Sequence, residues 1–310
     1  MGIAMGKKIV LTGTTLTDVD APKLAVVDLI ETVGSLWLVE PMHPANPWGA
    51  GVPVHAATVP NVLADFAAET AGIDPGTAGL DIYRTGFTGA QGLLERTARG
   101  GVHAIYSPTN ATNIGTGSSC GFAIRPLAAL RTYLRTNWGH KYYMSMWADI
   151  TRASLAGKQS NAIMSLARSG GSTTNYKMIV AQAEALPAST PPLLGRRWST
   201  WVAGVGSAGP RIINIARDES YVGAAPANDA EAGELFALIL GNAGTINSYT
   251  TAKEAVPSLI FYRGYLEDLT VSGRTYAEVD AIDHALYTKE VLTPGGRYYG
   301  DTFTDPATIP

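Results

Sequence analysis

Short apolar segments, each ended by turn residues, follow one another along most of the chain, and this succession limits the possible folds more than any other feature. Seven of them are typical of strands, at 102–107, 141–152, 162–167, 176–184, 199–206, 211–217 and 258–272. The 34 glycines and 18 prolines are scattered between such segments and supply the turns. Because little helical periodicity separates the strands, the pattern predicts a mainly β protein, a β-sandwich with a few short helices.

The segment KYYMSMWADI at 141–150 shows the alternation of a strand most clearly. Successive side chains of a strand point to opposite faces. One face would carry Tyr142, Met144, Met146, Ala148 and Ile150, which we expect between the two sheets. The other face would carry Tyr143, Ser145, Trp147 and Asp149.

Four segments have helical spacing instead. They are 61–69 with Asn61 as its cap, 126–134 with Pro126 in its first turn, 229–240, and a terminal helix after Ser272 or Thr275, either of which can cap it. In the terminal helix the predicted apolar stripe is Tyr276, Val279, Ile282 and Leu286.

These segments predict three parts. Residues 1–60 contain only short β-like pieces between Pro, Gly and Asp, and we expect them to form an extended arm that lies against the main domain or a neighbouring chain. Residues 61–100 are predicted to be a helix followed by a glycine-rich, loop-like connector. Residues 101–310 are expected to form the sandwich, ending in the short helix and a tail.

Composition and charge restrict the partners. A net charge of −3 without a basic stripe argues against nucleic acid binding, because phosphate neutralisation needs clustered Lys and Arg. No apolar run approaches the ~20 residues of a membrane helix, so membrane insertion is not expected. The single cysteine, Cys120, rules out an intrachain disulfide and a Cys-based zinc site, and the five histidines form no zinc motif.

Acidic and aromatic residues supply the candidate sites. Glu278, Asp280 and Asp283 are predicted to lie on the terminal helix and point to solvent. Acidic groups at 217–220, 228–234 and 265–269 offer oxygen donors for calcium, but they lack EF-hand spacing and are better explained as surface acids. The aromatic residues of the predicted strands fill either the core or a subunit interface, or else they form a platform for a glycan. The candidate carbohydrate-binding residues are Trp147, Tyr143 and Trp201.

Several segments together resemble the concanavalin A-like, or laminin-G-like, jelly-roll domain of virion proteins from tailed bacteriophages. They are GLLERTARGGVHAIYSP (92–108), GHKYYMSMWADITRA (139–153) and PSLIFYRGYLEDLTVSGRTYAEVDAID (257–283), with WSTWVAGV (198–205) and IVLTGTTLTDVDAPKL (9–24) in support. The resemblance implies two antiparallel sheets and a place in the virion.

From this resemblance we expect a structural protein without enzymatic activity or cofactor. Its expected place is the tail, as a component of the fibre, tip or baseplate, where it would contact host surface glycans. The arm would bind other virion proteins, and the chain would form a homo-oligomer, with a trimer as the expected state. One alternative is a capsid decoration or minor capsid protein. Another is a glycan hydrolase that resembles the laminarinase type, whose Glu-x-Asp-x-x-Glu motif corresponds to Glu278, Asp280 and Asp283, with Asp in the last place.

Overall fold

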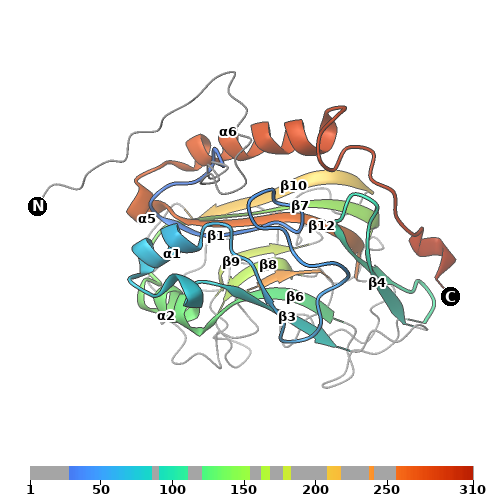
Figure 1. Cartoon of the computed structure of the whole chain (residues 1–310), viewed down its shortest axis with the longest axis horizontal. Helices are drawn as coiled ribbons and strands as arrows, with labels where there is room; N and C mark the ends of the chain where they lie inside the picture. Colours follow the sequence, from blue (N-terminus) through green and yellow to red (C-terminus); the bar gives the residue numbers. More distant parts are fainter. Residues whose placement is uncertain are drawn as a thin grey trace, which may run out of the picture.

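A computed structural model describes residues 28–85, 91–110, 121–153, 162–167, 177–182, 208–217, 237–240 and 256–309. The described strands form two antiparallel sheets, and the helices are few and lie outside them (Figure 1). The prediction of a mainly β, antiparallel fold is therefore confirmed.

The first sheet is built around one long strand, β12 (Ser258–Asp268). Along one side β12 pairs with β7 (Tyr142–Arg152), which in turn pairs with β10 (Gly209–Arg217). The other side of β12 is shared by β5 (Val102–Tyr106), which meets its first half, and β1 (Ser35–Val39), which meets its second half. Strand β4 (Gly92–Arg96) pairs with β5 at the edge.

The second sheet has the order β2-β3-β6-β11-β8-β9. Its strands are β2 (Thr58–Val59), β3 (Leu80–Thr85), β6 (Gly121–Pro126), β11 (Ala237–Ile239), β8 (Ala162–Ala167) and β9 (Lys177–Gln182). Among the described strands, only the connections β2 to β3, β4 to β5 and β8 to β9 stay within one sheet. All other connections carry the chain from one sheet to the other.

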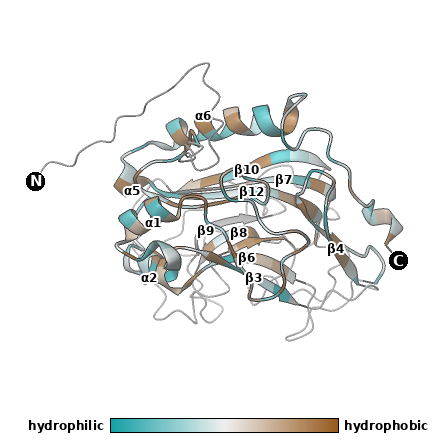
Figure 2. Ribbon diagram, in the orientation of Figure 1, coloured by the Kyte–Doolittle hydropathy of each residue, from teal (hydrophilic) through white to brown (hydrophobic). Residues whose placement is uncertain are grey.

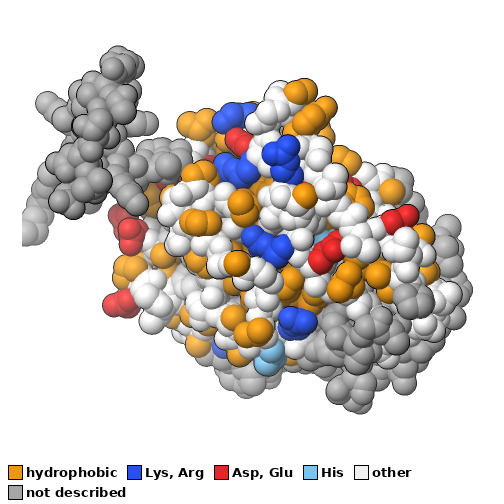
Figure 3. Space-filling model, turned by 45° about the vertical axis from the view of Figure 1, so that its right-hand side comes forward, with side chains coloured by type: hydrophobic (Ala, Val, Ile, Leu, Met, Phe, Trp, Pro, Cys, Tyr) orange, Lys and Arg blue, Asp and Glu red, His pale blue; other side chains and the backbone are white. Residues whose placement is uncertain are grey.

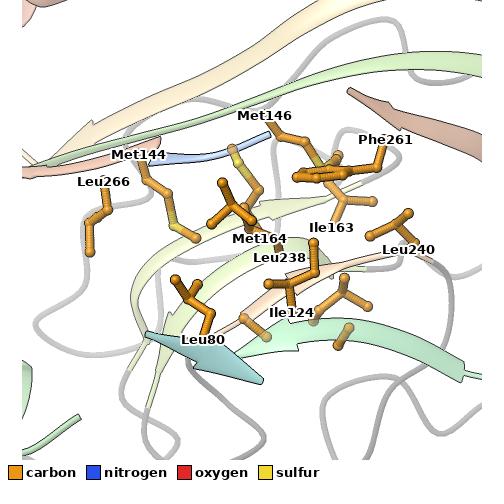
Figure 4. Close-up of a cluster of buried hydrophobic side chains, with 14 of the residues drawn as sticks. Leu80, Ile124, Met144, Met146, Ile163, Met164, Leu238, Leu240, Phe261 and Leu266 are labelled. Atoms are coloured by element: carbon orange, nitrogen blue, oxygen red, sulfur yellow. The ribbon is translucent and has the colours of Figure 1, made fainter. Parts of the chain in front are cut away.

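The core lies between the sheets. Figure 4 shows Met144 and Met146 from the first sheet facing Ile124 and Leu238 from the second, and hydrophobic residues run along the strands of both (Figure 2). All five residues that alternation assigned to the inner face of 141–150 are buried in this core, which confirms that prediction. At Gly264 the sheets approach so closely that an added Cβ would lie 2.2 Å from Leu238 Cδ1.

The helices lie at the margins and over one face. They are α1 (Ala64–Ala71), α2 (Ala128–Thr136), α5 (Leu269–Ser272) and α6 (Tyr276–Tyr287), with short turns at Pro75–Thr77, Thr288–Leu292 and Pro306–Thr308. Helix α6 crosses the outer side of the first sheet (Figure 1). It begins at a capping box in which Thr275 and Glu278 bond each other's backbone, so of the two predicted caps, Ser272 and Thr275, the structure uses Thr275. None of the helices in the described part of the chain is long and apolar enough to span a membrane.

The N-terminal third is more folded than predicted. Residues 35–39, placed by sequence in an extended arm, form β1, whose Leu36, Trp37 and Leu38 are buried. The connector predicted to be loop-like contains β3 and β4. Strands β1 and β3 are recognised mainly through partners distant in the sequence, β12 and β6, whereas β4 pairs with the adjacent β5 and was missed because its segment is rich in glycine.

Several elements also differ from the prediction in type or in where they end. The predicted strand 258–272 ends at Asp268, whose side chain accepts hydrogen bonds from the N–H groups of Thr270 and Val271 and so begins α5. Residues 237–239, predicted to be helical, form β11. Pro126 ends β6 instead of opening α2.

Asn61 precedes the N-cap of α1. Its buried side-chain amide donates hydrogen bonds to the carbonyl oxygens of Leu36 and Ala78 and accepts one from the N–H group of Leu38. The strand predicted at 199–206 and residues 229–236 of the predicted helix lie outside the described residues.

Candidate functional site

The outer face of the first sheet is the most elaborate polar region of the described structure. We call it the covered face and define it by Tyr143 and Trp147 of β7 and Tyr262, Arg263 and Tyr265 of β12. Helix α6 and the C-terminal residues pack on it. A register shift between Phe261 and Arg263 is a β-bulge, and it brings two successive residues, Tyr262 and Arg263, to the same face.

The two described carbohydrate-binding candidates lie beneath this cover. Trp147 and Tyr143 both have 0% of their surface exposed. The indole ring of Trp147 contacts Tyr287 edge to face, with 5.8 Å between ring centroids. A sugar stacks only on an exposed ring face, and neither ring offers one here, so of the alternatives that the sequence left open the structure fits burial in a core. Trp201 lies outside the described residues.

Asp283 connects α6 to the covered face. Its carboxylate accepts hydrogen bonds from Tyr143 OH at 2.9 Å and from Trp147 Nε1 at 2.8 Å, and the residue is fully buried. Burial raises the pKa of Asp283, while Arg263 and these hydrogen bonds act in the opposite direction. The prediction that Asp283 points to solvent is therefore wrong, because one face of α6 presses it against the sheet.

The three carboxylates of the laminarinase-like motif do not converge. Glu278 is exposed and accepts from the N–H and hydroxyl of Thr275. Asp280 contacts Asn214 and lies partly in solvent, whereas Asp283 is buried. A retaining or inverting hydrolase needs two carboxyl groups flanking one glycosidic bond. These residues do not provide that arrangement.

Arg263 holds the start of the described chain against the central strand. Its guanidinium makes a bidentate pair with Asp28, at 2.9 Å to Oδ2 and 3.1 Å to Oδ1. Its Cζ atom lies 4.5 Å from the centroid of the Trp147 ring, a cation–π contact. Burial alone would raise the pKa of Asp28, but the hydrogen bond from His43 and the charge of Arg263 hold that pKa well below its usual range.

A second buried carboxylate, Glu40, joins the C-terminal residues to the same cluster. Glu40 pairs with Arg297, accepts a hydrogen bond from Tyr298 OH at 3.1 Å, and lies 3.5 Å from Arg263. Two carboxylates therefore face two guanidinium groups, of which Arg263 is buried and Arg297 is partly exposed. We call Asp28, Glu40, Arg263 and Arg297 the buried ionic cluster.

Oxygen and nitrogen donors of Asp28, Glu40 and His43 lie within 4.8 Å of one another, as in a metal site. The guanidinium of Arg263 contacts both carboxylates and supplies the positive charge that a metal ion would otherwise provide. The acids at 265–269 are engaged in a similar way, since Glu267 pairs with Arg274 and Asp268 pairs with His140. The remaining calcium candidates, 218–220 and 228–234, lie outside the described residues.

His103 lies between a hydroxyl and a carboxylate, as in a hydrolase triad. Its Nδ1 is 2.8 Å from Glu95 Oε1, and its Nε2 is 2.8 Å from Thr151 Oγ1. Burial lowers the pKa of His103, which Glu95 partly opposes. His103 is wholly buried, however, and the ring of Phe303 packs against its imidazole ring, with 5.2 Å between ring centroids. Thr304 also bonds Glu95 through its N–H and its hydroxyl, so this set fastens the C-terminal residues to the sheet edge.

The buried ionic cluster was missed by sequence reasoning. One signal was present, because Arg263 interrupts the otherwise apolar and aromatic segment LIFYRGYL. Arginine is rarely buried without a partner. That signal predicts a carboxylate nearby, but it does not identify Asp28, which lies 235 positions away.

Acidic, basic and hydrophobic side chains are interspersed on the face shown in Figure 3. Comparison of the chain with protein-family models, with curated proteins and with solved structures finds no significant match.

Proposed function

We propose that this chain is a structural protein of a tailed-bacteriophage particle, located in the tail as a component of the fibre, tip or baseplate. Its fold would be a concanavalin A-like, or laminin-G-like, jelly roll. Support comes from the two facing antiparallel sheets and from the repeated passage of the chain between them, which is how a jelly roll is wound.

The observation that carries the proposal is the buried pair between Asp28 and Arg263. Asp28 directly follows residues 1–27, and Arg263 lies on β12, the central strand of the first sheet. A pull on the N-terminal residues would therefore act on the strand with pairing partners on both sides. This attachment suits an arm that binds the domain to other virion proteins.

The proposal includes no enzymatic activity. Its support is that the hydroxyl, imidazole and carboxylate around His103 are sealed by the C-terminal residues, and that the motif carboxylates on α6 are separated. Homo-oligomerisation as a trimer, and contact with host glycans, belong to the same proposal.

The test is to locate the chain in intact particles of the phage that encodes it. Mass spectrometry should detect the protein in purified virions, and a cryo-EM map should contain its two sheets in the tail. Density on the capsid shell instead would favour the decoration protein. Absence of the chain from purified particles would contradict a virion role altogether.

A further inference from the structure

A second polar cluster lies at the surface, where α6 crosses β10. Tyr276, Asp280 and His284 are four residues apart and share one side of the helix, and Asn214 of β10 lies beneath them. The amide nitrogen of Asn214 donates to Asp280 and lies 3.4 Å from His284 Nε2, while Tyr276 OH donates to Asn214 Oδ1 at 3.3 Å. We call these four residues the α6–β10 site.

The site is both accessible and fixed in position. Tyr276 is 38% exposed, and the side chains of His284 and Asp280 are 49% and 27% exposed. The ring of Tyr276 packs against the buried ring of Tyr143, with 5.8 Å between centroids. One aromatic face and several polar groups are thus held in place before any ligand arrives, which lowers the entropic cost of binding.

We propose that the α6–β10 site binds a pyranose unit of a host surface glycan. The apolar C–H face of the sugar would pack on the Tyr276 ring, and its hydroxyl groups would bond Asp280, Asn214 and His284. Sugar hydroxyls both donate and accept, which matches the carboxylate, amide and imidazole found together here. This inference rests on the glycan contact in the proposed function and replaces Trp147 and Tyr143 as its location.

A metal ion is the main competing ligand, because Asp280 and His284 are spaced i, i+4 on one helix, with 3.3 Å between Oδ1 and Nε2. The N–H₂ group of Asn214 lies against both of these atoms, and a cation bound to them would have to displace this donor. A neutral hydroxyl ligand leaves that amide in place. The geometry therefore favours the sugar.

Saturation-transfer NMR on the full chain provides the test. The probes are glucose, galactose, mannose, rhamnose and N-acetylglucosamine, each measured in buffer with EDTA. We expect transfer to the ring protons of at least one of them. Asp280→Ala should weaken that binding about tenfold, because a hydrogen bond to a charged group is lost. Tyr276→Ala should abolish it, whereas Tyr276→Phe keeps the stacking ring and most of the signal.

Tyr299→Ala is the matched control, since Tyr299 is equally exposed, at 40%, and lies elsewhere. It should bind like the unchanged protein, and thermal unfolding should show that all variants are folded. No transfer with any probe in EDTA, or equal transfer in the Tyr276→Ala variant, would overturn the site. Such a result would leave the virion location untouched, because that is measured on particles and not on sugars.

Discussion

At the scale of single residues, Arg263 joins several distant parts of the molecule on the covered face. It pairs with Asp28, approaches Glu40 and stacks on Trp147, so it connects the N-terminal residues, β1 and β7 through one guanidinium. A buried charge of this kind contributes little net stability while its partners are present. Its removal is costly, because the partners then stay buried without compensation.

We expect Arg263→Met to lower the free energy of unfolding by about 3–5 kcal/mol, because Asp28 and Glu40 would lose their nearest shared cation in a dry environment. Urea denaturation followed by circular dichroism measures this. Lys289→Met is the control, since Lys289 is 74% exposed in its pair with Glu290, and its loss should change stability by less than about 1 kcal/mol. Equal effects of the two substitutions would show that the cluster does not have this role.

The depressed pKa of Asp28 predicts a dependence on pH. The pKa of Asp28 is 3.8 in the unfolded chain and lower in the folded protein. Ionised Asp28 therefore stabilises the folded state at pH values above 3.8, and this contribution is lost as the pH falls toward the folded-state pKa. The stability difference between the unchanged protein and Asp28→Asn should therefore be largest near pH 7 and shrink steadily below about pH 4. Urea titrations between pH 2.5 and 7 check this, and a difference independent of pH would contradict it.

The inner residues of β7 were predictable from alternation alone, because each strand face repeats every second residue. The outer face was not predictable in the same way. Tyr143 and Trp147 lie on the strand face that alternation left open, and α6 together with residues from both ends of the described chain buries them. The bulge that turns Arg263 onto this face likewise depends on pairing with β7 and has no local sequence signature.

At the scale of elements, α6 determines what the covered face can do. Its start was predictable because the capping box is a local signal, with Thr275 and Glu278 three residues apart. Its position over the sheet was not, because Asp283 looks like a surface acid until Tyr143 and Trp147 are placed beneath it.

We expect Asp283→Ala to loosen α6 from the sheet. Tyr143 OH and Trp147 Nε1 would each lose a buried acceptor, at about 1–3 kcal/mol for each group left unpaired. Hydrogen exchange should become faster in α6, and Trp147 fluorescence should shift to longer wavelength. Ala281→Gln, at an exposed position of the same helix, is the control and should leave both unchanged, because glutamine keeps the helix propensity and Ala281 does not face the sheet. Unchanged exchange in the Asp283→Ala variant would contradict this role of the buried carboxylate.

At the scale of the whole molecule, the turn-bounded segments were sufficient to predict a mainly β protein, while the antiparallel sheets were expected only from the family resemblance. The order of strands could not be predicted, since β12 pairs with three strands separated from it by more than 100 residues. The same limitation explains why β1 was taken for part of an arm. Residues 35–39 belong to the sheet, so we place the proposed anchor in the residues before Asp28.

Deletion of residues 1–27 tests the central claim most directly, because it removes the proposed anchor and keeps Asp28 with its partner Arg263. The measurement is the amount of the shortened chain in particles assembled in its presence, relative to the full chain, with Lys289→Met as a full-length control. We predict a folded protein with an unchanged unfolding midpoint that is lost from the particles. Incorporation at the level of the full chain would contradict the anchoring role.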